Sequence, residues 1–134
     1  FCQEHGYTST HLGREFLASN PTDDNYTSAS DCCRLLSDIY SGTMVNADAS
    51  ADMLALLKAQ TRTGKIPSGV PSGVETANKT GELDTVENDA GIIYDTAKGI
   101  DLVVCFMSQD LNDTAAAQNS IAQISRSIYG YYNE

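Results

Sequence analysis

The sequence predicts an α+β fold in which an antiparallel sheet carries a long C-terminal helix and further helices come before the sheet. Two stretches, 31–40 and 113–132, repeat apolar residues at helical spacing. Between them the pattern changes to strands from Val74 onward, and residues 100–107 (IDLVVCFM) form a nearly continuous apolar run. The expected order is two helices, three antiparallel strands and one helix.

The first helix has a clear start and a clear end. Thr27 or Ser28 can cap its N-terminus, Asp31 follows Ser28 by three residues, and Gly42 ends the segment. Its apolar face consists of Cys32, Leu35, Leu36, Ile39 and Tyr40. A face this continuous predicts that the helix packs against another layer.

Two further helices are expected on the same grounds. Asp48 or Ser50 would cap the second helix, which ends near Gln60. Asp113 or Thr114 would cap the last one. One side of this last helix carries Ala117, Ile121, Ile124, Ile128 and Tyr131 or Tyr132. That stripe would lie lengthwise on the sheet.

The strands follow a stretch rich in proline and glycine. Residues 61–74 (TRTGKIPSGVPSGV) contain two prolines and three glycines, so no helix is expected there. A strand over 74–83 would lead through a turn around Asp84–Asp89 into a second strand, Ala90–Tyr94. The run 100–107 suits a strand covered on both faces, which suggests that further elements complete the fold. Residues 1–26 read as irregular chain.

Length and charge bound the function. With 134 residues the chain is one domain in size, and it begins Phe1-Cys2-Gln3 without an initiator Met, as if entered part-way through a fold. Eight basic residues against eighteen acidic ones give a net charge of −10, which argues against a nucleic-acid partner. No stretch is apolar enough to cross a bilayer. Any anion site would need locally concentrated positive charge, and Arg62, Lys65 and Lys79 are the basic residues nearest one another.

No cofactor and no metal are expected. The four cysteines include no C-x-x-C pair, the adjacent Cys32 and Cys33 cannot bridge each other without strain, and Cys2 and Cys105 read as buried free thiols. His11 and Glu15 are four residues apart and could share a helix face as metal ligands, with His5 as a third. Two histidines in a loop-rich segment are more often structural.

The segment Lys79-Thr80-Gly81-Glu82 carries the strongest chemical signal. Glycine weakens a strand unless a ligand or another backbone must approach closely. A lysine and a threonine beside it can hold a carboxylate, and the N–H after the glycine can point at a developing oxyanion. These features together would make the electrophilic half of an acyl-transfer site for an extended substrate lying along the sheet edge.

The ordered set of motifs resembles the carboxyl half of class A β-lactamases and the wider penicillin-recognising serine hydrolases and D,D-peptidases. It comprises "KTG", "AGIIY" and "LVVCFMS" on successive strands, an amphipathic last helix, and upstream "LGREFLASN", which is similar to the active-site omega loop. The resemblance implies that 1–60 form the omega-loop-like segment and helices of an α-domain. Residues 61–134 would then form the strands and C-terminal helix of the α/β-domain, giving a partial β-lactamase/transpeptidase-like fold.

The resemblance also implies residue roles in an acyl-enzyme mechanism. Lys79 would be the K-T-G lysine, Thr80 would contact the substrate carboxylate, Gly81 would leave room, and the Glu82 N–H would be an oxyanion donor. The S-x-x-K and S-D-N motifs that supply the nucleophile and its base do not occur in these residues. Two alignment registers are possible for the omega-loop glutamate that activates the deacylating water. Aligning Asn20 with the family's omega-loop asparagine places Phe16 at the position of this glutamate. Glu15 takes that position only after a one-residue shift.

Several expectations about partners follow from this resemblance. The substrate would be a β-lactam or a peptidoglycan stem peptide, met outside the cytoplasm. The alternatives are a D,D-peptidase, a non-catalytic sensor of β-lactams or peptidoglycan, and a related fold with another substrate, as in glutaminases. The chain alone should be inactive, and it should bind an amino-terminal counterpart or self-associate.

Overall fold

The computed structural model describes residues 1–20 and 22–133 and has the expected α+β architecture. Its elements are α1 (Ala29–Tyr40), α2 (Ala47–Lys58), α3 (Ile66–Gly69), β1 (Glu75–Leu83), β2 (Val86–Asp95), β3 (Ile100–Phe106) and α4 (Thr114–Tyr131). Among the described residues, no helix has the length and apolar character needed to cross a membrane.

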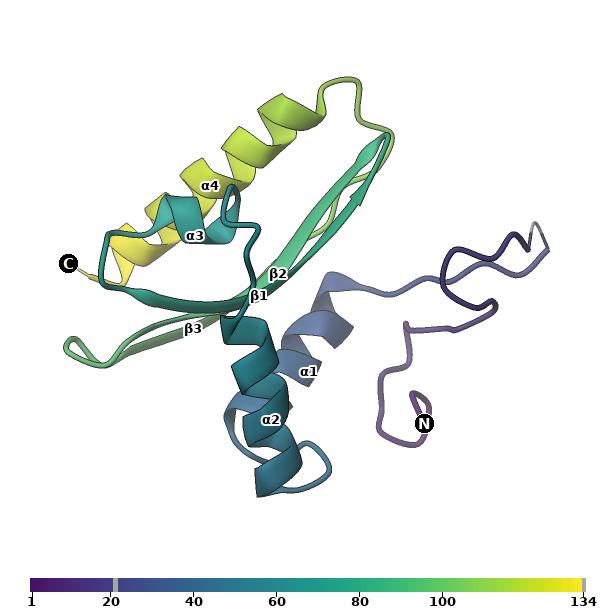
Figure 1. The fold of residues 1–134 in the computed structure, drawn as a ribbon, viewed down its shortest axis with the longest axis horizontal. Coiled ribbons are helices and arrows are strands. Elements are labelled where there is room, and N and C mark those ends of the chain that lie inside the picture. Colours follow the sequence, from purple (N-terminus) through teal and green to yellow (C-terminus); the bar gives the residue numbers. More distant parts are fainter. Residues whose placement is uncertain (21, 134) are drawn as a thin grey trace.

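The sheet lies between two helical layers (Figure 1). Its three strands are antiparallel in the order β1-β2-β3, with Lys79 opposite Ala90 and Ala90 opposite Cys105. Helices α3 and α4 pack on one face around Ile66, Ile93 and Ile121. Helices α1 and α2 cover the other face. Leu36 packs there with Ala77 and Ile92, so the strands are buried on both sides.

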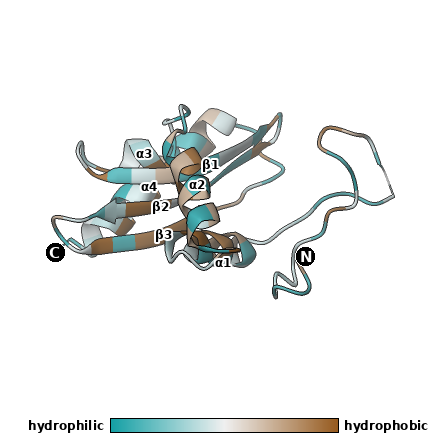
Figure 2. Ribbon diagram, turned by 60° about the horizontal axis from the view of Figure 1, so that its bottom comes forward, coloured by the Kyte–Doolittle hydropathy of each residue, from teal (hydrophilic) through white to brown (hydrophobic). Residues whose placement is uncertain are grey.

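The segment before α1 is mostly loop. Tyr7 is buried beside Met44 and donates a hydrogen bond to Asp38 of α1 at 2.8 Å, which ties this segment to the helices. Much of the stretch over residues 12–20 and 22–25 then projects away from the sheet (Figure 1 and Figure 2), while Leu12, Asp24 and Asn25 line an open pocket with Val86 and Asn88 of β2. This geometry agrees with the irregular chain predicted for residues 1–26.

The helix caps test the sequence interpretation directly. Ser28 caps α1 by accepting from the Asp31 N–H, and Asp113 caps α4 by accepting from the Ala116 N–H. Both residues are among the predicted candidates. The prediction for α2 is wrong, because Asn46 is its cap and neither Asp48 nor Ser50 fills that role. An Asn side chain caps as well as Asp or Ser.

Two predictions for the middle of the chain are also wrong. Residues 66–69 form the one-turn helix α3, where no helix was expected. Pro67 is tolerated because it lies in the first turn, where its missing N–H has no helical acceptor. The turn between β1 and β2 contains only Asp84 and Thr85, so residues 86–89 belong to β2.

Candidate active site

The Lys79–Glu82 segment lies on the free edge of the sheet. Among residues 1–20 and 22–133, strand β1 pairs only with β2, and Leu83 and Val86 flank the two-residue turn. Such flanking residues form a hydrogen-bonded pair, and bonded and non-bonded pairs alternate along the ladder. The N–H and C=O groups of Thr80 and Glu82 therefore point outward, away from β2.

A cleft of about 340 Å³ opens between this edge, the sheet and the helices. We call it the sheet–helix cleft. Lys79, Thr80 and Gly81 line it from β1, and α1 and α2 line the opposite side. The structure thus brings three of the predicted site residues onto one cavity.

Lys79 is exposed and its Nζ donates to the carbonyl oxygen of Thr80. This bond to an outward carbonyl agrees with the ladder alternation described above. Thr80 itself is only 6% exposed and lies opposite Asp89 of β2. The lysine is therefore accessible from the cleft, whereas most of the threonine side chain is covered.

Gly81 is not required by the fold. A Cβ added there would meet only the Asn88 side chain, at 3.5 Å, which is ordinary van der Waals contact. Gly91 is different, since its Cβ would lie 2.7 Å from the Cβ of Asn78. The chain needs glycine at 91 for its own packing, whereas at 81 the space beside the backbone is free.

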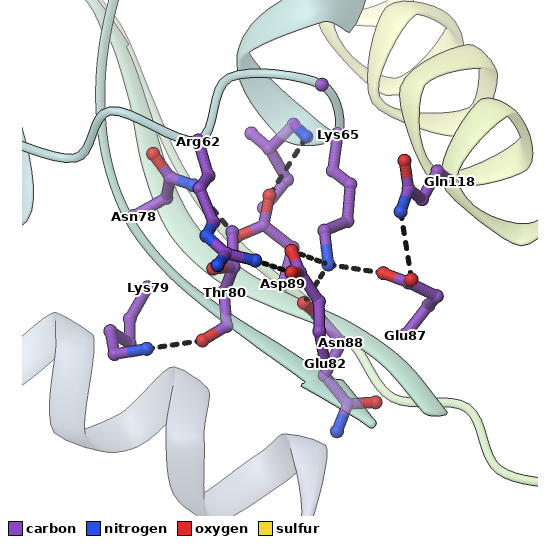
Figure 3. A network of polar contacts seen from close by, with 12 residues as sticks. Arg62, Lys65, Asn78, Lys79, Thr80, Glu82, Glu87, Asn88, Asp89 and Gln118 are labelled. Atoms are coloured by element: carbon purple, nitrogen blue, oxygen red, sulfur yellow. Dashed lines mark hydrogen bonds and ion pairs between the residues drawn. The ribbon is translucent and has the colours of Figure 1, made fainter. Parts of the chain in front are cut away.

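Beneath the edge lies a buried ionic cluster that sequence reasoning missed (Figure 3). Lys65 is 2% exposed, and its Nζ lies 2.6 Å from Glu87 Oε2, 3.0 Å from the Asn88 carbonyl and 3.1 Å from Glu82 Oε1. Glu82 also pairs with Arg62. The hairpin that carries the Lys79–Glu82 segment is thus anchored from the α3 side by one buried cation.

The charges in this cluster are balanced by direct contacts. Burial acts to raise the pKa of Glu87, but hydrogen bonds from Lys65 and Gln118 outweigh it and leave the pKa below its usual value. Gln118 of α4 donates to Glu87 at 2.9 Å. The carboxyl therefore stays ionised in the folded protein and holds Lys65 in place.

Asp89 forms a second buried contact set next to the cluster. It is fully buried and accepts hydrogen bonds from the Asn78 amide at 2.9 Å and from the Ile66 N–H at 3.0 Å. Burial raises the pKa of Asp89, and these two hydrogen bonds only partly oppose that rise. Asp89 thereby ties β1, β2 and the start of α3 together under Thr80.

The loop over residues 12–20 and 22–25 is held closed by contacts between its own residues. Arg14 Nε lies 2.5 Å from Asp24 Oδ1, and Asn25 Oδ1 accepts from the Gly13 and Arg14 N–H groups at 2.9 and 3.0 Å. The hydrogen bond from the positively charged Arg14 lowers the pKa of Asp24. His11 and Tyr26 form a β-bridge at the neck of the loop.

Glu15 and Phe16, the two candidates for the deacylating position, lie in this loop. Both are exposed, Phe16 by 89%, and neither lines the sheet–helix cleft. Leu17 follows with a positive φ of 62°. The structure does not bring either residue to the Lys79–Glu82 edge, so the register stays a prediction.

The histidines have ordinary neighbours. His11 Nε2 lies 2.6 Å from Asp23 Oδ1 and its ring stacks on Tyr26, while the His5 ring packs against Phe1. His11 therefore pairs with Asp23 rather than with Glu15. Within residues 1–20 and 22–133, no three His, Cys, Asp or Glu side chains gather as metal ligands would.

Comparison with known proteins places this geometry in a family. A model of the Beta-lactamase enzyme family matches residues 1–132. No curated protein sequence matches the chain at a significant level.

Solved structures show the same arrangement of elements. A β-lactamase from Sphaerobacter thermophilus is 26% identical with a TM-score of 0.89, and the match covers 98% of this chain and 51% of that one. PBP-A is 26% identical with a TM-score of 0.82, over 98% of this chain and 48% of that one. An acyl-enzyme complex of a PBP-A variant with penicillin G is similar at 24% identity, with a TM-score of 0.82 and the same coverage. The chain spans about half the length of each.

Proposed function

Because the chain belongs to the β-lactamase enzyme family, we propose that it forms the carboxyl-terminal part of a serine hydrolase that reacts with β-lactams through an acyl-enzyme. Residues 1–60 would contribute the omega-loop-like segment and α-domain helices, and 61–134 the strands and last helix of the α/β-domain. The nucleophilic serine and its base would come from an amino-terminal segment, since S-x-x-K and S-D-N are absent from this sequence.

The observation that carries this proposal is the free space beside Gly81. The fold tolerates a Cβ there, yet the edge presents outward backbone groups and an accessible lysine on a cleft. An extended acyl substrate would use that space to pair with β1. In the same pose the Glu82 N–H would donate to the oxyanion formed when the serine attacks the carbonyl.

Lys79 and Thr80 would act on the substrate's charge. The Lys79 ammonium would supply positive potential to a net acidic molecule that otherwise repels anions. The Thr80 hydroxyl would donate to the substrate carboxylate. Because Thr80 is nearly buried, its role is tested by comparing Thr80→Val with Thr80→Ser, which keeps the hydroxyl. Only the valine variant should weaken acylation.

The experiment is covalent labelling by fluorescent penicillin of a protein in which this chain follows a segment carrying S-x-x-K and S-D-N. The intact protein should be labelled, Lys79→Ala should be labelled much more slowly, and this chain alone should neither be labelled nor hydrolyse nitrocefin. Labelling of the chain alone would place a nucleophile within these residues and refute the proposal. Absence of labelling in the longer protein would favour the sensor described below.

A second candidate is a penicillin-binding D,D-peptidase or a non-catalytic sensor on the same fold. It is favoured by the position of Glu15 and Phe16 away from the cleft, since a missing deacylation base leaves the acyl-enzyme long-lived. If the protein is a hydrolase, we propose that Glu15 is the deacylation base. Glu15→Gln should then slow release of bound penicillin at least tenfold, with Glu4→Gln as an exposed control. Unchanged release would favour the peptidase.

Partner and location follow from the same proposal. The chain would meet its substrate outside the cytoplasm, as a secreted or envelope-anchored protein. Its amino-terminal counterpart, or a second copy of the chain, would cover apolar residues such as Leu56, which is 75% exposed on α2. Size-exclusion chromatography of the chain, alone and with the counterpart added, tests this. A chain that stays monomeric and does not bind the counterpart would contradict this proposal.

A further inference from the structure

Two cysteines from distant parts of the sequence line the sheet–helix cleft together. Cys32 lies in the first half of α1 and Cys105 lies on β3. Helix α1 packs directly on β3, which places the two cysteines on facing elements of the same cleft. Both cysteines are free thiols, and each is partly exposed.

Cys105 shares a cross-strand row with Lys79. Lys79 is opposite Ala90, and Ala90 is opposite Cys105. Residues directly opposite one another point to the same face of a sheet, and neighbouring strands lie about 4.8 Å apart, so Cys105 stands roughly 10 Å from Lys79 along this row. The thiol pair therefore lies on the floor of the cleft that also contains the Lys79–Glu82 edge.

The surroundings of Cys32 favour its thiolate. The neighbouring Cys105 thiol is the main cause that lowers the pKa of Cys32 to about 6, and the Thr27 hydroxyl, 3.8 Å from its Sγ, assists. The N-terminal end of α1 is close by and acts in the same direction. Burial and the Asp31 carboxylate oppose the shift. The contact with Cys32, together with burial, raises the pKa of Cys105.

Cys33 provides an internal comparison. It is the next residue on the same helix and is also partly buried. Burial, and then the neighbouring Cys32, raise its pKa, and it does not line the cleft. The two adjacent cysteines thus differ in environment, although the sequence gives no sign of which one is reactive.

We propose that Cys32 and Cys105 form a reversible disulfide that links α1 to β3 across the floor of the sheet–helix cleft. The oxidant would be a low-molecular-weight disulfide such as oxidised glutathione. Cys32 thiolate attacks one of its sulfurs and releases one glutathione thiolate. Cys105 then loses its proton to solvent and attacks the Cys32 sulfur, which releases the second thiolate. Two protein thiols are oxidised as one glutathione disulfide is reduced.

The bond would change what the cleft can do. It would fix α1 against β3 beside the row that leads to Lys79, and it would hold the helix and the strand together at that point. Oxidation should therefore raise the thermal midpoint of unfolding, because a long chain segment is closed into a loop. It should also narrow the cleft on the side away from β1.

The test uses the purified chain in glutathione buffers of stepped redox potential. Free thiols are blocked with N-ethylmaleimide, and proteolytic peptides are mapped by mass spectrometry. We expect a Cys32–Cys105 cross-link with a mass lower by two hydrogen atoms, which dithiothreitol reverses. Cys33→Ser should still form it, whereas Cys32→Ser and Cys105→Ser should not. Circular dichroism of each variant checks that the fold is retained.

Three outcomes would overturn the proposal. The first is that Cys32 stays a mixed disulfide with glutathione in oxidising buffer. The second is that Cys32 links to Cys2, which lines a separate cavity of about 100 Å³ with it. The third is that native Cys32 and Cys33 react with iodoacetamide at equal rates near pH 7. These two rates are measured on the unsubstituted chain, so this test remains valid even if a serine variant fails to fold.

Discussion

Alanine at Gly81 and alanine at Gly91 should have opposite effects on stability. At Gly91 the new Cβ would meet the Asn78 Cβ at 2.7 Å and the Ala77 carbonyl oxygen at 3.2 Å, so strand β1 must shift. Overpacking of this kind costs about 1–3 kcal/mol. At Gly81 the nearest atom is the Asn88 Cβ at 3.5 Å, and no positive φ is recorded there. Losing glycine's freedom in the unfolded chain should then stabilise by about 0–1 kcal/mol.

These free energies translate into separable melting temperatures. At about 2.1 cal/mol/K per residue, a 134-residue chain has an unfolding entropy near 0.28 kcal/mol/K. Gly91→Ala should therefore lower the midpoint by roughly 4–11 °C, and Gly81→Ala should leave it unchanged or raise it by up to about 4 °C. Differential scanning calorimetry of the two variants and the parent chain, at one concentration, measures both shifts.

The comparison can fail in a clear way. If Gly81→Ala destabilises the chain as much as Gly91→Ala does, glycine at 81 serves the fold, and the argument for a ligand beside it is lost. If Gly81→Ala is stable and still accepts penicillin in the longer protein, the space beside Gly81 is not where the substrate lies. Stability retained and labelling lost is the result that the structure leads us to expect.

The remaining predictions concern the buried cluster and a helix cap. Lys65→Met leaves the Glu87 carboxylate buried without its cation and should cost about 3–5 kcal/mol in urea unfolding, whereas Lys58→Met at an exposed pair should cost under about 1 kcal/mol; equal costs would contradict the burial of the cluster. Since the pKa of Glu87 is lowered below its usual 4.5, its stabilisation is complete above that pH and lost as the pH falls further, so Glu87→Gln should flatten the acid limb of the stability curve. An unchanged acid limb would refute this. Asp113→Ala removes the bond to the Ala116 N–H and should cost about 1 kcal/mol by the same assay, and no measurable loss would exclude the cap.

The sequence could predict the elements whose burial shows as a period. Strand β3 and helices α1 and α4 appear near their predicted positions, because each buries an apolar face at regular spacing. Strand β1 and helix α2 also lie near their predicted positions. The start of β2 could not be predicted in this way. Glu87, Asn88 and Asp89 look like turn residues, yet they pair along β1 because Lys65, Asn78 and the Ile66 N–H satisfy their buried polar groups.

The sequence also could not predict that Lys65 is buried or that Gly69 packs against a helix, for a related reason. A lysine within a glycine- and proline-rich stretch is usually solvated, and only the fold brings Glu82 and Glu87 around it from two strands. Gly69 looked like a helix breaker. In the structure, a Cβ there would lie 2.3 Å from the Ala122 carbonyl, so glycine allows α3 to pack against the backbone of α4. Neither contact leaves a local pattern in the sequence.

The two faces of strand β1 explain why the candidate site can be both rigid and open. Successive side chains of a strand point to opposite faces, so Asn78 and Glu82 enter the buried polar contacts on the α3 side while Lys79 and Gly81 line the cleft. The contacts on the first face fix the backbone that the second face presents. A change at Lys65 should therefore act on substrate through the position of the Glu82 N–H, whereas a change at Lys79 should act through its charge and its hydrogen bond to the Thr80 carbonyl. High salt should narrow the difference in the rate of penicillin labelling between the parent protein and Lys79→Ala. It should leave the labelling defect of Lys65→Met unchanged, because screening weakens an exposed charge far more than a buried one. A Lys65→Met defect that salt abolishes would show that its charge reaches the substrate directly.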